Sequence, residues 1–258
     1  MSEPVLVQER RGAVLVLRLN RPDARNALTS ELMSLMGNAL LEAEESPDIR
    51  CVVLTGTGDR AFCAGMDLAD FAKGGTPTGD DAQGQEAFGR FASGGSKVPV
   101  VGAAQATAVA GGFELLLNCD LVVASETAKF GLPEVKRGLM AAGGGVYLTT
   151  RIPPAVALEL LLTGDTIEAP RAVALGLVNQ VVPADQVVDA AVALAERIAA
   201  NGPLAVKATR EIARAAATDY AGARELMNDW LPKVFGSADA TEGATAFIEK
   251  RDPVWTGT

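Results

Sequence analysis

The sequence contains no histidine in its 258 residues, and this absence excludes several catalytic mechanisms. Nucleophiles of the Ser-His-Asp and Cys-His kinds pass their proton to an imidazole. Metal sites with histidine ligands are excluded as well, because no imidazole nitrogen is available to bind the metal. Acid/base chemistry in this chain must therefore use Asp, Glu, Lys, Tyr or Cys.

The sequence also has few aromatic residues, no excess of positive charge and no long apolar run. Only 5% of the residues are aromatic, whereas 48% are hydrophobic and 27 are glycine, which is typical of an α/β enzyme. The net charge of −9 argues against non-specific binding to nucleic acid or to an anionic membrane. No uninterrupted apolar run reaches the ~18 residues that span a bilayer.

Signals for disulfides and for export are also missing. The three cysteines, Cys51, Cys63 and Cys119, cannot all pair with one another, and the first residues lack the apolar segment of a signal peptide. We therefore expect a soluble, reduced protein of the cytoplasm, with no nucleic-acid or membrane partner.

Strand-like and helix-like segments alternate over residues 1–195. After two β-rich runs near residues 5–8 and 13–19, nearly continuous apolar runs recur, as expected of strands that are covered on both faces. These runs are residues 51–55, 98–103, 121–124 and 177–182. We predict one stacked or spiral α/β core, about residues 1–195, and no second independent domain.

Helices are predicted both inside this core and after it. Residues 29–44 carry one apolar face and can be capped by Thr29 or Ser30. From about residue 187 only helical stretches are predicted, at 187–200, 204–217, 221–235 and 239–250, and we assign residues 196–258 to a C-terminal helical region. Residues 74–95 are rich in Gly, Asp and Ser, which predicts a mobile loop that contains one helical turn.

Two glutamates, Glu114 and Glu134, stand in mostly apolar surroundings twenty residues apart. Burial disfavours the charged form of a carboxyl group, so its pKa rises toward the range useful for acid/base catalysis. Such a pair could handle two protons on either side of one bond. Each glutamate could instead be an ordinary residue of a helical first turn, where the helix dipole favours negative charge.

The motifs around these glutamates resemble the crotonase (enoyl-CoA hydratase/isomerase) superfamily over essentially the whole chain. In order, the motifs are NRP at 20–22, NAL at 26–28, AFCAGMD at 61–67, AGGFEL at 110–115, CD at 119–120, FGLPE at 130–134, GGG at 143–145, LTGD at 162–165 and TAF at 245–247. Each motif alone is weak, but their order and spacing together are specific. The resemblance implies an α/β spiral of strand-strand-helix units with a C-terminal helical trimerisation region.

The resemblance also implies a reaction. An acyl-CoA thioester would place its carbonyl oxygen between the backbone N–H groups of Ala64 and Gly111. Glu114 would deprotonate a water molecule and Glu134 would protonate the α-carbon, so that a 2-trans-enoyl-CoA becomes a 3-hydroxyacyl-CoA. Isomerases of the family commonly lack the first glutamate, which favours a hydratase. No metal or redox cofactor is expected, because coenzyme A belongs to the substrate.

Further residues are expected at the substrate and CoA site, and most are implied by the same motifs. They are Arg25, Ala64, Gly65, Met66, Asp67, Leu68, Gly111, Gly112, Pro133, Phe247 and Lys250. The side chain of Asp67 is expected to cap a helix over residues 67–72, while the loop backbone meets the adenine end of CoA. Arg25 and Lys250 could equally be solvated surface charges. The family implies a homotrimer or a dimer of trimers, in which the late helices cover a neighbour's acyl pocket.

Several alternatives remain open at this point. Gly56, Gly58 and Ala61 fit the G-x-G-x-x-A dinucleotide fingerprint, but that fingerprint must open a helix and the residues that follow lack helical periodicity. Cys63 lies next to a proposed oxyanion donor, yet no histidine is present to lower its pKa, so it is expected in the pocket wall. An enoyl-CoA isomerase, another acyl-CoA lyase and a catalytically silent acyl-CoA binder are the remaining possibilities.

Overall fold

The computed structural model describes residues 3–72 and 81–258. The chain divides into two compact units, Met1–Ala195 and Glu196–Thr258. The first unit contains both glutamates and all strands found in the described part of the chain.

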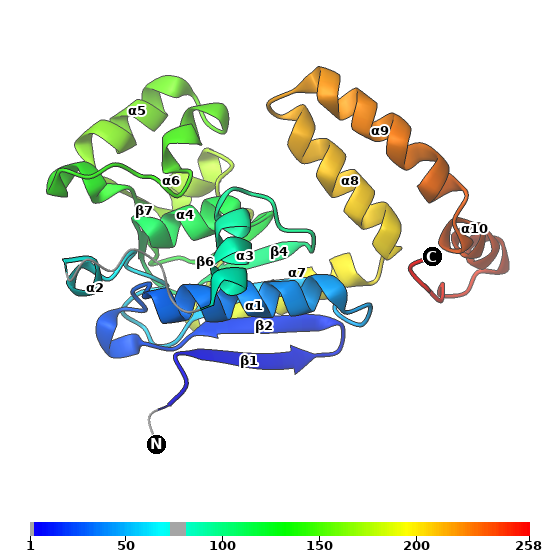
Figure 1. Ribbon diagram of the computed structural model, residues 1–258, viewed down its shortest axis with the longest axis horizontal. Coiled ribbons are helices and arrows are strands. Elements are labelled where there is room, and N and C mark those ends of the chain that lie inside the picture. Colours follow the sequence, from blue (N-terminus) through cyan, green and yellow to red (C-terminus); the bar gives the residue numbers. More distant parts are fainter. Residues whose placement is uncertain (1–2, 73–80) are drawn as a thin grey trace. The chain divides into compact units, whose positions relative to one another are not determined.

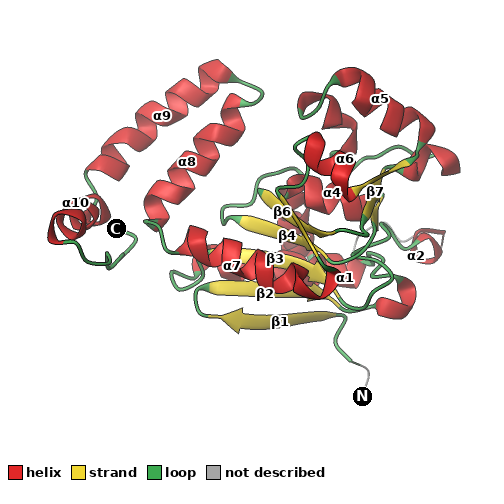
Figure 2. Ribbon diagram, turned by 180° about the vertical axis from the view of Figure 1, so that it is seen from behind, coloured by secondary structure: helices red, strands yellow, loops and turns green. Residues whose placement is uncertain are grey.

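A large sheet forms the centre of the first unit (Figures 1 and 2). Its strands follow the order β1-β2-β3-β4-β6-β9 within the described residues. They are β1 Leu6–Arg11, β2 Val14–Leu19, β3 Cys51–Gly56, β4 Val100–Ala104, β6 Leu121–Ser125 and β9 Gln180–Val182. Only the β1–β2 pair is antiparallel; the others are parallel. Every residue of β3 and β4 is buried, which explains their continuous apolar sequence.

The strand predicted over residues 177–182 is correct only at its end. Leu177 and Val178 are buried, but they belong to a turn in which the Leu177 N–H donates to the Ala172 carbonyl. Apolar residues in a buried turn look the same in sequence as residues of a buried strand.

A second, smaller sheet carries the segments that lead to the two glutamates. It contains β5 Ala108–Val109, β7 Lys129–Gly131 and β8 Thr166–Glu168. Strands β5 and β7 are parallel, with Ala108 opposite Phe130 and Val109 opposite Gly131. Glu114 and Glu134 follow these two strands, so the pairing brings their segments together.

Helices cover both faces of the large sheet: α1 lies on one face and α7 on the other (Figures 1 and 2). Helix α1 spans Ser30–Glu45, and the Thr29 side chain caps it by accepting from the Leu32 N–H at 3.3 Å. Helix α7 spans Val187–Ala199. The other helices of the first unit are α2 Leu68–Ala72, α3 Ala82–Ala92, α4 Gly111–Asn118, α5 Pro154–Thr163 and α6 Ala169–Ala174. Short 3₁₀ helices occupy Pro22–Ala24, Pro133–Arg137, Gly145–Thr150 and Ala184–Gln186.

The loop prediction for residues 74–95 is wrong over residues 82–92, which form helix α3. Residues 73–80 lie outside the described residues, but α3 is an 11-residue helix that begins after a cap from Asp81. Its Ala87 and Phe91 are buried. Helix α3 packs closely on α1. A Cβ added at Gly37 of α1 would lie only 1.8 Å from the carbonyl oxygen of Gly84 in α3. The glycines that suggested a loop allow two helix backbones to approach each other.

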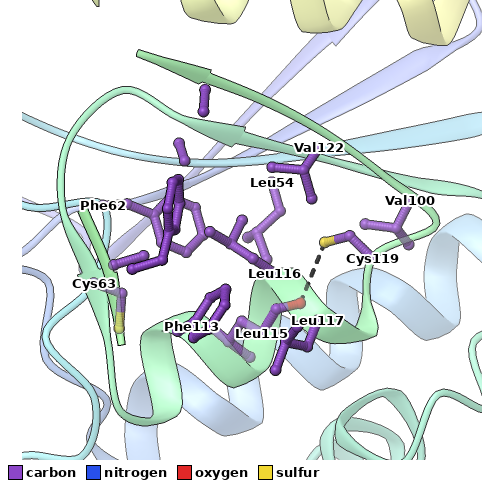
Figure 3. Close-up of a cluster of buried hydrophobic side chains, with 14 of the residues drawn as sticks. Leu54, Phe62, Cys63, Val100, Phe113, Leu115, Leu116, Leu117, Cys119 and Val122 are labelled. Atoms are coloured by element: carbon purple, nitrogen blue, oxygen red, sulfur yellow. Dashed lines mark hydrogen bonds between the residues drawn. The ribbon is translucent and has the colours of Figure 1, made fainter. Parts of the chain in front are cut away.

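Helix α4 is deeply embedded in the core of the first unit. Figure 3 shows Leu116 of α4 beside Leu54 of β3 and Val122 of β6. Residues 112–117 of α4 are all buried, including Glu114. A helix packed on this many sides has little freedom to shift, so it can fix a catalytic group rigidly.

The second unit is helical, with α8 Pro203–Ala216, α9 Tyr220–Phe235 and α10 Ala238–Glu249. Trp230 of α9 donates to the Glu211 carboxylate of α8 at 2.9 Å. The buried Asp239 carboxylate accepts from the backbone N–H groups of Thr256 and Gly257, which fixes the end of the chain on α10. None of the helices described in either unit is long and apolar enough to cross a membrane.

Candidate active site

A backbone N–H group without an acceptor in the described part of the chain lies at the N-terminus of α4. Gly111 is the first residue of α4, and its N–H has no acceptor among the described residues. Ala110, immediately before it, has the uncommon dihedral angles φ 52° and ψ −135°. A non-glycine residue with positive φ is strained and persists only where the surroundings enforce it. The strained turn directs the chain from β5 into α4.

A second N–H group without an acceptor lies beside the first. Met66 forms a parallel bridge with Leu28, in which Leu28 N–H donates to the Gly65 carbonyl and Asp67 N–H donates to the Leu28 carbonyl. This pattern leaves the Met66 N–H without an acceptor among the described residues. A Cβ on Gly111 would lie 3.7 Å from the Met66 nitrogen, so the two peptide groups are neighbours.

The expectation that the Ala64 N–H would receive the thioester oxygen does not fit this geometry. Its N–H donates to the Arg25 carbonyl at 3.0 Å and is therefore already engaged. Met66, two residues further on, presents the N–H that lies beside Gly111. Gly65 between them has φ +89°, and a Cβ there would come within 3.0 Å of the Gly111 nitrogen. The close approach of the two segments thus requires glycine at position 65.

Glu114 lies on the first turn of α4, and its carboxylate faces a glycine loop. The residue is 7% exposed, and its Oε1 accepts from the Gly145 N–H at 2.9 Å. A Cβ on Gly143 would lie 2.7 Å from Oε2, so the loop backbone touches the carboxylate directly. Burial raises the pKa of Glu114, while the N–H groups of Gly145 and Gly143 lower it by a smaller amount.

Glu134 lies on the 3₁₀ helix Pro133–Arg137 and is half-buried. Its Oε2 is buried and has no hydrogen-bond partner among the described residues. Burial is the largest effect on the pKa of Glu134 and raises it; the residue's own N–H lowers it, and the charge of Glu114 raises it further. The two carboxyl groups therefore influence each other electrostatically.

Aromatic packing fixes the two glutamate segments relative to each other. Phe113, adjacent to Glu114, contacts Phe130 of β7 with ring centroids 5.5 Å apart. The N–H of Ala110 also donates to the Gly131 carbonyl at 3.0 Å. The structure thus brings together the glutamate pair and, at the start of α4, the two open N–H groups. This arrangement can hold a polarised carbonyl and exchange protons beside it.

Comparison with known proteins identifies the family. Residues 9–258 match the family model described as enoyl-CoA hydratase/isomerase. The chain belongs to the enoyl-CoA hydratase/isomerase family. The family resemblance inferred from the sequence motifs is confirmed.

Family members with established names are similar over nearly the full chain. Enoyl-CoA hydratase EchA19 of Mycobacterium tuberculosis is 42% identical over 259 residues, which cover 98% of this chain and 96% of that protein. Carnitinyl-CoA dehydratase of Proteus mirabilis is 40% identical over 253 residues, covering 96% of each.

Solved structures of the family confirm the fold. The crystal structure of an enoyl-CoA hydratase from Mycobacterium tuberculosis matches with a TM-score of 0.91 at 42% identity, covering 99% of this chain and 100% of that one. The carnitinyl-CoA hydratase of Mycobacterium avium matches with a TM-score of 0.77 at 40% identity, covering 100% of both chains. The predicted crotonase-like α/β fold is therefore correct, whereas trimerisation stays a prediction.

The Asp67 side chain caps helix α2 and forms an ion pair. Asp67 Oδ1 accepts from the N–H groups of Ala69 and Asp70 at 3.1 and 3.3 Å, which caps α2 as predicted. Its Oδ2 pairs with Arg21 at 3.0 Å, and this ion pair lowers the pKa of Asp67. Sequence reasoning gave no role to Arg21, which holds the Asp67 side chain and also donates to the Ala27 carbonyl.

The remaining predicted CoA residues occupy different environments. Arg25 is exposed with φ 53°, Leu68 begins α2 and is exposed, and Pro133 begins the 3₁₀ helix that carries Glu134. Phe247 and Lys250 belong to the second unit, where both are exposed. Their participation in the site stays a prediction.

Two alternative readings of the sequence lose their structural basis. Cys63 is fully buried, and burial raises the pKa of its thiol to about 12, so it has the character of a wall residue and not of a nucleophile. Residues 57–67 contain no helix, so the glycines at 56 and 58 do not open a dinucleotide-binding helix.

Proposed function

We propose that this protein is an enoyl-CoA hydratase that adds water across the double bond of a 2-trans-enoyl-CoA to give a 3-hydroxyacyl-CoA. The observation that carries the proposal is the glutamate pair, the buried Glu114 and the half-buried Glu134 with its buried Oε2, in the unit where two backbone N–H groups stand without acceptors among the described residues. The name of the Mycobacterium tuberculosis relative supports the same reaction.

The N–H groups of Met66 and Gly111 would receive the thioester oxygen. Addition of water to the conjugated double bond moves an electron pair onto this oxygen, so its negative charge is greatest in the transition state. Donors that are already in place stabilise this charge without reorganisation, and losing one typically costs about 3 kcal/mol. The positive end of the α4 dipole acts in the same direction.

Glu114 would be the base and Glu134 the acid. Glu114 has backbone N–H donors that favour its charged form, whereas the partnerless Oε2 of Glu134 and the nearby charge of Glu114 favour the protonated form of Glu134. Glu114 takes a proton from water while the water oxygen bonds to the β-carbon. Glu134 gives its proton to the α-carbon, and a proton then returns from Glu114 to Glu134 in preparation for the next turnover.

A second candidate is the reverse reaction on a 3-hydroxyacyl-CoA such as carnitinyl-CoA. It is favoured by the 40% identity to carnitinyl-CoA dehydratase over 96% of the chain. The same two carboxyl groups serve hydration and dehydration, because each proton transfer is reversible. Double-bond isomerisation is less well supported, because it does not require the retained Glu114.

The rest of the proposal follows from these roles. Proton transfer and charge stabilisation are supplied by groups of the chain itself, so we propose that no metal or redox cofactor takes part. We propose further that the enzyme works in the cytoplasm as a homotrimer or a dimer of trimers, and that Arg25, Phe247 and Lys250 contribute to CoA binding.

The test follows the loss of the conjugated enoyl-thioester absorbance over a series of 2-trans-enoyl-CoA chain lengths. Mass spectrometry identifies the product, and the Glu114→Gln/Glu134→Gln double variant is the matched control for background hydration. Hydration of at least one substrate by the wild type, absent in the control, is expected. No hydration of any chain length, together with migration of the double bond in a 3-enoyl-CoA, would identify an isomerase. A separate reaction with carnitinyl-CoA distinguishes the dehydratase.

A further inference from the structure

The amide of Asn118 joins three segments around Glu114. Asn118 is the last residue of α4, and its Nδ2 lies 2.9 Å from the Ala92 carbonyl, 2.9 Å from the Glu114 carbonyl and 3.1 Å from the Gly143 carbonyl. Three carbonyl oxygens can only face the amide's donor end, which fixes the orientation of the side chain. The three carbonyls belong to the end of α3, to α4 and to the glycine loop.

The glycine loop, residues 143–145, forms the wall against which the Glu114 carboxylate rests. Gly145 N–H donates to Oε1 at 2.9 Å, and added Cβ atoms at Gly143 and Gly145 would lie 2.7 and 3.0 Å from the carboxylate oxygens. Gly144 between them has φ +108°, a conformation that only glycine adopts readily. A loop of three glycines has high conformational entropy, so it needs external contacts to stay in place.

Asn118 supplies such a contact at the start of this loop. Its bond to the Gly143 carbonyl ties the loop to the same helix that carries Glu114, one turn earlier. Its bond to the Ala92 carbonyl anchors the assembly to the end of α3. A shift of a few tenths of an ångström would weaken the bond from Gly145 to the carboxylate, because hydrogen-bond energy depends steeply on geometry.

We propose that Asn118 is a positioning residue for the acid/base chemistry of Glu114, because its amide holds the glycine loop against the Glu114 carboxylate. This inference rests on the proposed function, in which Glu114 acts as the base. Asn118 acts through the loop and does not touch the substrate. A role limited to closing the end of α4 would affect stability alone, so the two roles can be separated by experiment.

The main variant is Asn118→Leu, which keeps the size of the side chain, removes the donor and adds no charge. We expect kcat to fall about 10- to 100-fold, part of the usual effect of general acid/base catalysis, with KM changed by less than about threefold. The acid limb of the kcat profile should move to higher pH, because weaker N–H bonds from Gly145 and Gly143 raise the pKa of Glu114. Glu134 is the titratable group facing Glu114, and a Glu134→Gln background separates its contribution to the profile.

A second measurement does not depend on activity. Hydrogen–deuterium exchange of a peptide covering residues 141–150 should be faster in Asn118→Leu than in the wild type. Asn118→Gln keeps the amide donor and should restore most of the kcat and the position of the acid limb. Asn179→Ala is the control, because it removes another Asn side-chain hydrogen bond, in which the Val122 N–H of β6 donates to Asn179 Oδ1 at 2.8 Å. Asn179→Ala should lower Tm and leave the pH profile of kcat unchanged.

The outcomes separate this inference from the proposed function. The role of Asn118 would be overturned if the wild type hydrates an enoyl-CoA while Asn118→Leu shows an unshifted pH profile of kcat and unchanged hydrogen–deuterium exchange. A wild type that hydrates no enoyl-CoA would overturn the proposed function, while the exchange comparison would still decide whether Asn118 holds the loop. If Asn118→Leu does not fold, Asn118→Asp replaces it, since it has nearly the same shape and cannot donate when ionised. Wild-type exchange in that variant would equally refute the proposal.

Discussion

Substitution of Gly112 by alanine tests how closely the catalytic geometry depends on the packing of α4. A Cβ at this position would lie 2.1 Å from the carbonyl oxygen of Cys63 and 2.7 Å from its carbonyl carbon. This backbone cannot turn aside, because Cys63 forms a bridge with Ala108 and its carbonyl accepts from the Val109 N–H at 3.1 Å. The methyl group must therefore displace α4 itself.

The size of the displacement can be worked out from these distances. Ordinary Cβ contacts begin at 3.4 Å, so full relief of the 2.1 Å contact needs a shift of about 1.3 Å. Gly111 and Glu114 lie on the same turn and would move with the helix. A misplacement of about 1 Å costs on the order of 100-fold in rate. Overpacking costs about 1–3 kcal/mol of stability, offset by about 1 kcal/mol of helix propensity that alanine gains over glycine.

We therefore expect Gly112→Ala to stay folded with a modestly lower Tm and a kcat reduced about 100-fold. The enoyl-thioester absorbance assay gives kcat, and calorimetry gives Tm. Gly89→Ala is the matched control, because Gly89 lies in α3 and a Cβ there would meet nothing within 4 Å. It should keep the wild-type kcat and an equal or higher Tm. A Gly112→Ala enzyme with kcat within threefold of the wild type would refute the argument.

Three further predictions follow from the same structure. Glu114→Gln and Glu134→Gln should each lower kcat by at least about 100-fold while leaving acyl-CoA affinity nearly intact in equilibrium binding; full turnover in Glu114→Gln would contradict its role as base. Because burial raises the pKa of Glu134, the folded state binds its proton more tightly than the unfolded state, and stability falls as pH rises above the unfolded value. Glu134→Gln should thus have a higher Tm than the wild type at about pH 8, with the difference shrinking toward about pH 4, and equal Tm values throughout would count against this burial. Three large apolar side chains of the second unit are exposed: Leu231 and Phe235 on α9 and Phe247 on α10. Light scattering at micromolar concentration should therefore show a trimer or a hexamer, and a monomer would contradict the proposed assembly.

Segments with strong local signals were predictable from sequence. Helix α1 has an apolar face and a Thr29 cap, and β3 and β4 are continuous apolar runs; in both cases the local pattern and the tertiary packing require the same structure. The segment containing α3 could not be predicted in this way. Its glycines indicate a loop locally, whereas in the structure Gly84 faces Gly37 and lets α3 pack on α1.

The sequence by itself determined the family and the two catalytic candidates. Glu114 and Glu134 stand in motifs whose order is specific, and a glutamate among apolar residues already indicates a raised pKa. The sequence did not determine which N–H groups are open. That depends on the Leu28–Met66 bridge and on the Arg25 carbonyl, which engages Ala64.

Only the tertiary structure decided how Glu114, the proposed base, is held. The glycine loop and Asn118 meet Glu114 from positions up to 31 residues away along the chain. Backbone hydrogen bonds of this kind leave no periodic signal, because any residue type supplies the same N–H and carbonyl groups. The physical reason is general. The sequence specifies the chemistry of each side chain, whereas the segments that pack against a backbone group decide whether that group has a hydrogen-bond partner.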